Sequence, residues 1–234
     1  MYKIIVIQKK GEKEMEENQE NKAEELKQET VNTFNQAKEQ MKNINFKEEA
    51  EIGKGLLKKL WKNPVETIKE VVNDKENKCF KTALLLVAVW AIVELLKMIL
   101  MFSMSEYADF EFLPTLKVTV APILKVIAMA LALYFVNNRV KDSITKSLTS
   151  VTIAHVPGII VSIIEIISLF AVEAIKIISP IISILNIITA ILMYFTVKAY
   201  AKEENEENTV KKFILVQAVF YLIRFVISYL GISI

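Results

Sequence analysis

The stretch that decides the fold is VTIAHVPGIIVSIIEIISLFAVEAIKIISPIISILNIITAILMYFTV, residues 151–197. Only Glu165, Glu173 and Lys176 interrupt its apolar character with a charge. A single helix over this stretch would be far longer than the roughly 20 residues that cross a bilayer. The stretch therefore predicts two membrane spans that fold back on each other as a hairpin.

The composition of the whole chain agrees with a membrane protein. The 234 residues are 53% hydrophobic, yet 24% are charged, and the charges concentrate between residues 9 and 81. Because the charges are segregated, the formal net charge of +2 gives no argument for a nucleic-acid partner. The single cysteine, Cys79, excludes an internal disulfide framework.

Residues 1–53 are predicted to form a charged cytosolic arm that is partly helical or disordered. The β-prone opening leaves two candidate translation starts, Met1 and Met15. Residues 16–47 are a candidate binding segment for a protein partner, and the alternative is a solvated, marginal helix. Gly53 and Gly55 are expected to end the arm. The apolar stripe of the candidate segment consists of Leu26, Phe34, Ala37, Met41 and Ile44.

Residues 54–81 are predicted to form an amphipathic interfacial segment. Lysines beside a tryptophan are typical of an element at the cytoplasmic membrane interface, where lysines reach anionic headgroups. Residues 63–66 then predict a helix start, with Asn63 at the N-cap, Pro64 at the first position and Glu66 at the third. The predicted interfacial anchor is Lys58, Lys59, Trp61 and Lys62.

Residues 82–234 are predicted to form a five-helix transmembrane domain, so the fold class is all-α. The N-terminal flank and the loops after the second and fourth spans are rich in Lys or Arg, whereas the other two connections contain only Lys176. By the positive-inside rule, the N-terminus is cytoplasmic and the C-terminus lies outside. The lipid bilayer is thus an expected partner, and a bacterial cytoplasmic membrane is the expected location. Whether the chain forms a homo-oligomer is left open. The predicted spans are 82–104, 115–136, 151–172, 180–197 and 213–234.

The sequence resembles the prokaryotic branch of the Yip family. The resemblance covers about residues 56–234 and is carried by Lys62-Asn63-Pro64 before an amphipathic helix, by five spans, and by SLTSVTIAHVP at residues 147–157. It implies an integral five-span protein with a cytosolic N-terminus. Eukaryotic members act in Golgi and endosomal trafficking and bind prenylated Rab GTPases. This chain lacks their Asp-Leu-Tyr-Gly-Pro type of motif before the first span, so GTPase binding is not carried over.

Several ionisable residues fall inside the predicted spans, where each costs about 2.5–3.5 kcal/mol at the centre and needs a partner or a purpose. Four of them lie near a common depth when residues are counted from the outer ends of the spans. Three interpretations stay open: the charges register the helices, they line a polar cavity, or water and snorkelling satisfy them. Glu94 also lies one helical turn from Lys97 and can pair with it. The predicted intramembrane polar layer is Glu94, Lys125, Glu165 and Arg224.

His155, Pro157 and Gly158 are predicted to kink the start of the third span, because a proline inside a helix removes a backbone hydrogen bond. His155 itself is expected to be a solvated or capping residue, with proton sensing as the alternative. No metal site is predicted, because there is no second histidine and the one cysteine lies elsewhere in the chain.

The sequence predicts no enzyme and no cofactor. No paired aspartates lie inside the spans, no two histidines share a helix, and no signature for nucleotide or flavin binding occurs. Two hypotheses for function follow. The first is a non-enzymatic, Yip-like scaffold that organises membrane or protein partners through its arm. The second is a small transporter or channel-like protein that uses the polar layer.

Overall fold

The computed structural model of the chain describes residues 45–104, 112–137, 144–170, 175–201 and 205–229, together with positions 28, 31, 32, 35, 38 and 39. The chain divides into two compact units, residues 1–43 and 44–234. Every regular element in the described residues is a helix, which confirms the all-α prediction. The candidate translation starts and most of the segment at 16–47 lie outside the described residues.

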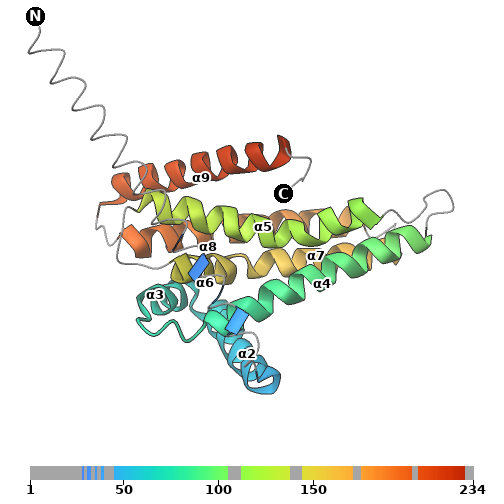
Figure 1. Ribbon diagram of the computed structural model, residues 1–234, viewed down its shortest axis with the longest axis horizontal. Helices are drawn as coiled ribbons and strands as arrows, with labels where there is room; N and C mark the ends of the chain where they lie inside the picture. Colours follow the sequence, from blue (N-terminus) through green and yellow to red (C-terminus); the bar gives the residue numbers. More distant parts are fainter. Residues whose placement is uncertain are drawn as a thin grey trace, which may run out of the picture. The chain divides into compact units, whose positions relative to one another are not determined.

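Eight helices make up the described part of the second unit (Figure 1). α5 packs against both α4 and α9, and α8 packs against both α7 and α9. In chain order the helices are α2 (Phe46–Lys62), α3 (Pro64–Asn73), α4 (Phe80–Met104), α5 (Phe112–Val136), α6 (Ile144–Ala154), α7 (Val156–Phe170), α8 (Ile175–Ala201) and α9 (Glu206–Tyr229).

Three of these helices, α4, α5 and α8, are long and apolar enough to cross a membrane, and the bent pair α6–α7 makes a fourth candidate if it is counted as one span. The most apolar windows of α4, α5 and α8 are only 11%, 39% and 17% buried inside the protein. Helices that expose so much apolar surface need lipid around them, since water would leave that surface unfavourably hydrated. The described helices therefore point to a membrane location. α9, the predicted fifth span, is not one of these candidates.

The interfacial segment begins differently from the prediction. α2 runs through Gly53 and Gly55, so the predicted end of the arm at these glycines is wrong. Neither glycine faces a steric restriction, because a Cβ at Gly55 would meet nothing within 4 Å and one at Gly53 would lie 3.4 Å from Thr82 Cγ2. Thr82 also donates a buried hydrogen bond of 2.8 Å to the Glu49 carboxylate, which ties α2 to α4.

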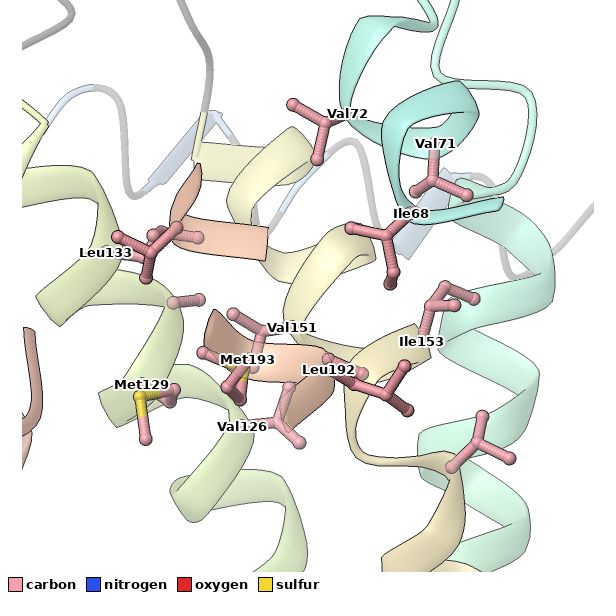
Figure 2. Packing of buried hydrophobic residues seen from close by; sticks show 14 of the residues in the cluster. Ile68, Val71, Val72, Val126, Met129, Leu133, Val151, Ile153, Leu192 and Met193 are labelled. Atoms are coloured by element: carbon pink, nitrogen blue, oxygen red, sulfur yellow. The ribbon is translucent and has the colours of Figure 1, made fainter. Parts of the chain in front are cut away.

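α3 is packed into the bundle. It begins at Pro64 with Asn63 at its N-cap, as predicted, although the Asn63 side chain makes no capping hydrogen bond. Thr67 Oγ1 instead donates to the Asn63 carbonyl oxygen at 2.9 Å. Figure 2 shows the apolar face of α3 directed into the core, where Ile68 is fully buried. The other members of this face are Val71 and Val72.

α6 is buried along nearly its whole length, with α3, α4, α5 and α8 packed around it. It is rich in hydroxyl side chains, which would be costly to bury without partners. Thr149, Ser150 and Thr152 each donate to the carbonyl oxygen one turn earlier, at 2.8, 2.9 and 2.8 Å. These local bonds satisfy the hydroxyls, so that a polar helix can sit inside the bundle.

The last two helices start earlier than the sequence predicts. α8 already begins at Ile175 and contains Pro180, so the predicted turn over residues 173–179 is wrong from Ile175 onward. α9 begins at Glu206, where Asn205 Oδ1 accepts a hydrogen bond of 2.9 Å from the backbone N–H of Glu207. The predicted charged loop before the fifth span is therefore partly helical.

Candidate functional site

The polar residues at the centre of the bundle lie on facing sides of α4 and α7. Glu94 contacts Ser162, and Lys97 contacts Glu165, and each pair is separated by 68 residues. The constant offset means that the two helices run parallel in one register. Trp90, Glu94 and Lys97 share a face of α4 because residues four and three apart stack on a helix. The matching residues of α7 are Gly158, Ser162 and Glu165, with the same spacing.

A continuous chain of polar contacts follows from this register. Trp90 Nε1 donates to Ser162 Oγ at 2.9 Å, and Ser162 Oγ donates to Glu94 Oε1 at 2.6 Å. Lys97 Nζ lies 2.6 Å from Glu94 Oε2 and 2.8 Å from Glu165 Oε2. One ammonium group thus bridges two carboxylates from two helices. We call these five residues the α4–α7 polar chain.

The Trp90 indole is held from several directions. The Lys125 Nζ atom of α5 lies 5.8 Å from the ring centroid, within the range of a cation–π contact. The His155 ring is stacked at 6.4 Å between centroids. On α7, Gly158 has no side chain, and a Cβ there would lie 3.1 Å from the Trp90 ring. The absence of a side chain at Gly158 is what lets α4 and α7 approach at this level.

The structure does not bring the four residues of the predicted polar layer together in one cluster. Glu94 and Glu165 come together through Lys97, which the sequence analysis had paired only with Glu94. Lys125 lies against Trp90 instead of a carboxylate. Arg224 is exposed on α9, and among the described residues it has no ion pair.

Sequence reasoning missed two members of the polar chain, Trp90 and Ser162. The signal was present, because the first and third predicted spans carry polar or small residues at the same intervals of four and then three. Parallel spans can align such intervals face to face. That signal becomes useful only once these two spans are known to be neighbours.

The bend at His155 lies at the junction of α6 and α7, where the two helix axes differ by 45°. The His155 backbone N–H donates to the carbonyl oxygens of Val151 and Thr152, at 3.0 and 3.1 Å, and the ring Nδ1 donates to Val151 at 2.9 Å. Pro157 has no N–H to continue the ladder. His155 is only 3% exposed, so the solvated alternative of the prediction is wrong, whereas the ring hydrogen bond to Val151 at the end of α6 agrees with the capping alternative.

The residues of the predicted interfacial anchor are all exposed on the last two turns of α2. Lys59 forms an ion pair of 2.9 Å with Glu70 of α3, but both side chains are more than 60% exposed, so the pair contributes little to stability. The other members of the anchor are Lys58, Trp61 and Lys62.

Cys79 lies just before α4 and is half-buried. Burial raises the pKa of its thiol, and the nearby carboxylates of Asp74 and Glu49 raise it further. A thiol with a raised pKa carries little thiolate at neutral pH and is a weak nucleophile. This environment favours a plain thiol over a reactive cysteine.

Comparisons with known proteins found no relative of this chain. No protein-family model matches the chain, and neither the curated proteins nor the solved structures contain a significant match. Within the described ranges, no group of three or more His, Cys, Asp or Glu side chains is arranged to hold a metal ion.

Proposed function

We propose that the chain is a non-enzymatic, Yip-like five-span protein of a bacterial cytoplasmic membrane. It acts as a scaffold that presents residues 16–47 to a cytosolic protein partner. The observation that carries this proposal is that α2, which begins at the end of this segment in the sequence, is fixed to the membrane bundle.

The fixation of α2 rests on buried contacts. Glu49 accepts the hydrogen bond from Thr82 of α4, and Leu56 and Leu60 belong to the hydrophobic core. α3, which follows directly, contributes the fully buried Ile68. A segment that only tethers the bundle needs no such anchoring, whereas a scaffold benefits from a rigid element next to its binding segment in the sequence.

The α4–α7 polar chain also supports a scaffold over a transporter. A conduction path needs polar groups that face water or a passing solute. Here the carboxylates of Glu94 and Glu165 both form ion pairs with Lys97, so each already has a partner within the protein. Such pairing favours the first interpretation of the charges, in which they register the helices.

The proposed five-span topology makes α9 the last crossing. The part of α9 that follows its charged first turns, residues 213–229, is mostly apolar and about 17 residues long, at the short end of the range of about 17–25 residues that a span requires. In a Cys79→Ser background, we expect Tyr229→Cys to react with a membrane-impermeant maleimide in intact cells. Lys212→Cys should react only after permeabilisation, as should the cytosolic control Lys62→Cys. Labelling of Tyr229→Cys only from the cytoplasmic side would reduce the topology to four spans.

The scaffold hypothesis predicts that the apolar stripe of the arm contacts the partner. A photoreactive amino acid at Phe34 is expected to give one discrete crosslinked band in cells. Replacing both Leu26 and Met41 by serine should reduce that band at least fivefold, because the partner would lose apolar contacts on either side of the probe. The measurement is the band intensity relative to the uncrosslinked chain.

The matched control for this experiment is the double replacement Lys38→Ser and Glu39→Ser, which alters charged positions of the same segment. It should leave the crosslink within twofold of the unchanged chain. A band that survives deletion of residues 16–33 and the Met41→Ser change together would place the partner elsewhere. Equal losses in both double variants would argue for a non-specific electrostatic contact.

A further inference from the structure

An apolar groove lies where the α2–α3 corner meets the bundle. Its volume is about 250 Å³, and its lining is almost wholly apolar. The residues that matter for its chemistry are Trp61 and Pro64 at the corner, Pro157 at the start of α7, and Ile188 and Ile191 on α8. Trp61 is 57% exposed and Ile191 is 48% exposed, so the groove opens on the surface of the bundle.

The groove lies at the depth of a lipid acyl chain. On α8, Ile188 and Ile191 precede Lys198 by roughly 10–15 Å at about 1.5 Å per residue. Lys198 belongs to the last turn of α8 and marks the cytoplasmic headgroup level in the proposed orientation. Half of the hydrocarbon core is about 15 Å thick, so the groove falls within the cytoplasmic leaflet.

Water is a poor occupant of such a groove. A water molecule occupies roughly 30 Å³ and needs two to four polar partners, whereas this lining offers few polar atoms. An empty groove would forfeit the dispersion contacts of its lining. A hydrocarbon chain satisfies the lining without requiring hydrogen bonds.

Unpaired cations stand beside the groove. Lys58 and Lys62 lie one turn apart on α2 and flank Trp61. Neither has a carboxylate partner in the described part of the chain, whereas their neighbour Lys59 is paired with Glu70. Lysine stems lie along apolar surface while the ammonium groups extend to the headgroups, where they attract phosphate.

We propose that this groove binds one acyl chain of an anionic phospholipid from the cytoplasmic leaflet, and that Lys58 and Lys62 bind its phosphate. The inference rests on the membrane placement of α2 in the proposed function, but it does not depend on the partner of the arm. The bound lipid fills the corner between α2, α7 and α8 and thereby fixes α2 against the bundle.

Native mass spectrometry of the full chain tests the proposal, with dioleoyl phosphatidylglycerol and dioleoyl phosphatidylcholine as probes. We expect one tightly retained phosphatidylglycerol and at least fivefold less phosphatidylcholine. The double variant Lys58→Gln, Lys62→Gln should lower phosphatidylglycerol retention about tenfold. The matched control Lys69→Gln, Lys211→Gln removes two exposed lysines elsewhere and should leave retention within twofold.

A second experiment locates the acyl chain of the bound lipid. Phosphatidylglycerol with a diazirine in the middle of one acyl chain should crosslink mainly to Trp61, Pro64 and residues 188–192. Ile191→Trp, which fills the groove from an exposed position, should reduce this crosslink at least fivefold without lowering the yield of folded protein. Labels spread evenly over α4 and α8 would overturn the proposal, as would equal retention of the two lipids.

Two further outcomes separate this inference from the proposed function. A variant without residues 16–43 should retain the lipid as the full chain does. If the chain shows no preference for phosphatidylglycerol while the cysteine labelling and the crosslink at Phe34 give the expected results, only the lipid site is overturned and the proposed function stands. A lipid-free dimer in which the Ile191→Trp change disrupts the dimer would show that a second copy of the chain fills the groove, and would also overturn the site.

Discussion

Lys97→Leu is expected to lower the free energy of unfolding by about 3–5 kcal/mol, the range seen when one partner of a buried ion pair is removed. Lys97 lies within 2.8 Å of the carboxylates of both Glu94 and Glu165. The side chains of Lys97 and Glu94 are only 17% and 11% exposed, so water cannot replace the lost ammonium group. Reversible unfolding in mixed detergent micelles measures the effect.

Two controls make this result specific to the pairing. Lys117→Leu removes a lysine near the N-terminal end of α5 and should change stability by no more than about 0.5 kcal/mol. The triple variant Glu94→Gln, Lys97→Met, Glu165→Gln should recover most of the loss, because replacing a whole buried pair is often nearly neutral. If the triple variant is as unstable as the single one, the charges do more than pair with one another.

The Lys97 bridge shows where sequence reasoning stops. The pair with Glu94 follows from the helical repeat, because the two residues are one turn apart on the same helix. The contact with Glu165 depends on which spans are neighbours and in which register they pack. That information lies in the combined packing of α4 and α7 and is not contained in any local pattern.

The same distinction explains the predictions for the glycines and for α6. Gly53 and Gly55 suggest a helix end by propensity, but the buried Glu49–Thr82 contact and the core leucines of α2 outweigh a cost of about 1 kcal/mol per glycine. The sequence places residues 144–150 in the connection before the third span, yet they form the buried first part of α6. Their burial becomes understandable only when their hydrogen bonds to the preceding turn are seen.

Length and apolarity, in contrast, were sufficient to locate the first two predicted spans. α4 and α5 begin and end within a few residues of the predicted first and second spans, since a span is defined by length and apolarity alone. The bend at His155 follows from Pro157, whose effect on a helix is likewise local. The helix starts at Ile175 and Glu206 were harder to predict from the sequence, because the flanking charges and Pro180 are typical of loops.

Trp90→Ala is expected to destabilise the protein by about 3–5 kcal/mol, as large-to-small changes of buried aromatic residues do. Trp90 is 5% exposed and contacts α7 through Ser162 and Gly158. Its loss removes the indole hydrogen bond, the contact with Lys125, and the packing that joins α4 to α7. Unfolding in the same micelle system measures this loss.

Gly158→Ala gives the complementary half of the test. The new Cβ would lie 3.1 and 3.2 Å from two atoms of the Trp90 ring, and the ring cannot easily retreat because Ser162 and His155 hold it. We expect a loss of about 1–3 kcal/mol from overpacking. Gly55→Ala is the matched control, because its Cβ meets nothing within 4 Å and it should stabilise α2 by about 0.5–1 kcal/mol.

Combining the two changes decides whether Trp90 is the cause. In the Trp90→Ala background the space beside α7 is empty, so Gly158→Ala should cost little or fill part of the cavity. The double variant is then more stable than the sum of the single effects predicts, by a coupling of about 1–3 kcal/mol. Strict additivity would mean that Gly158 matters for the bend at His155 and not for the approach of Trp90.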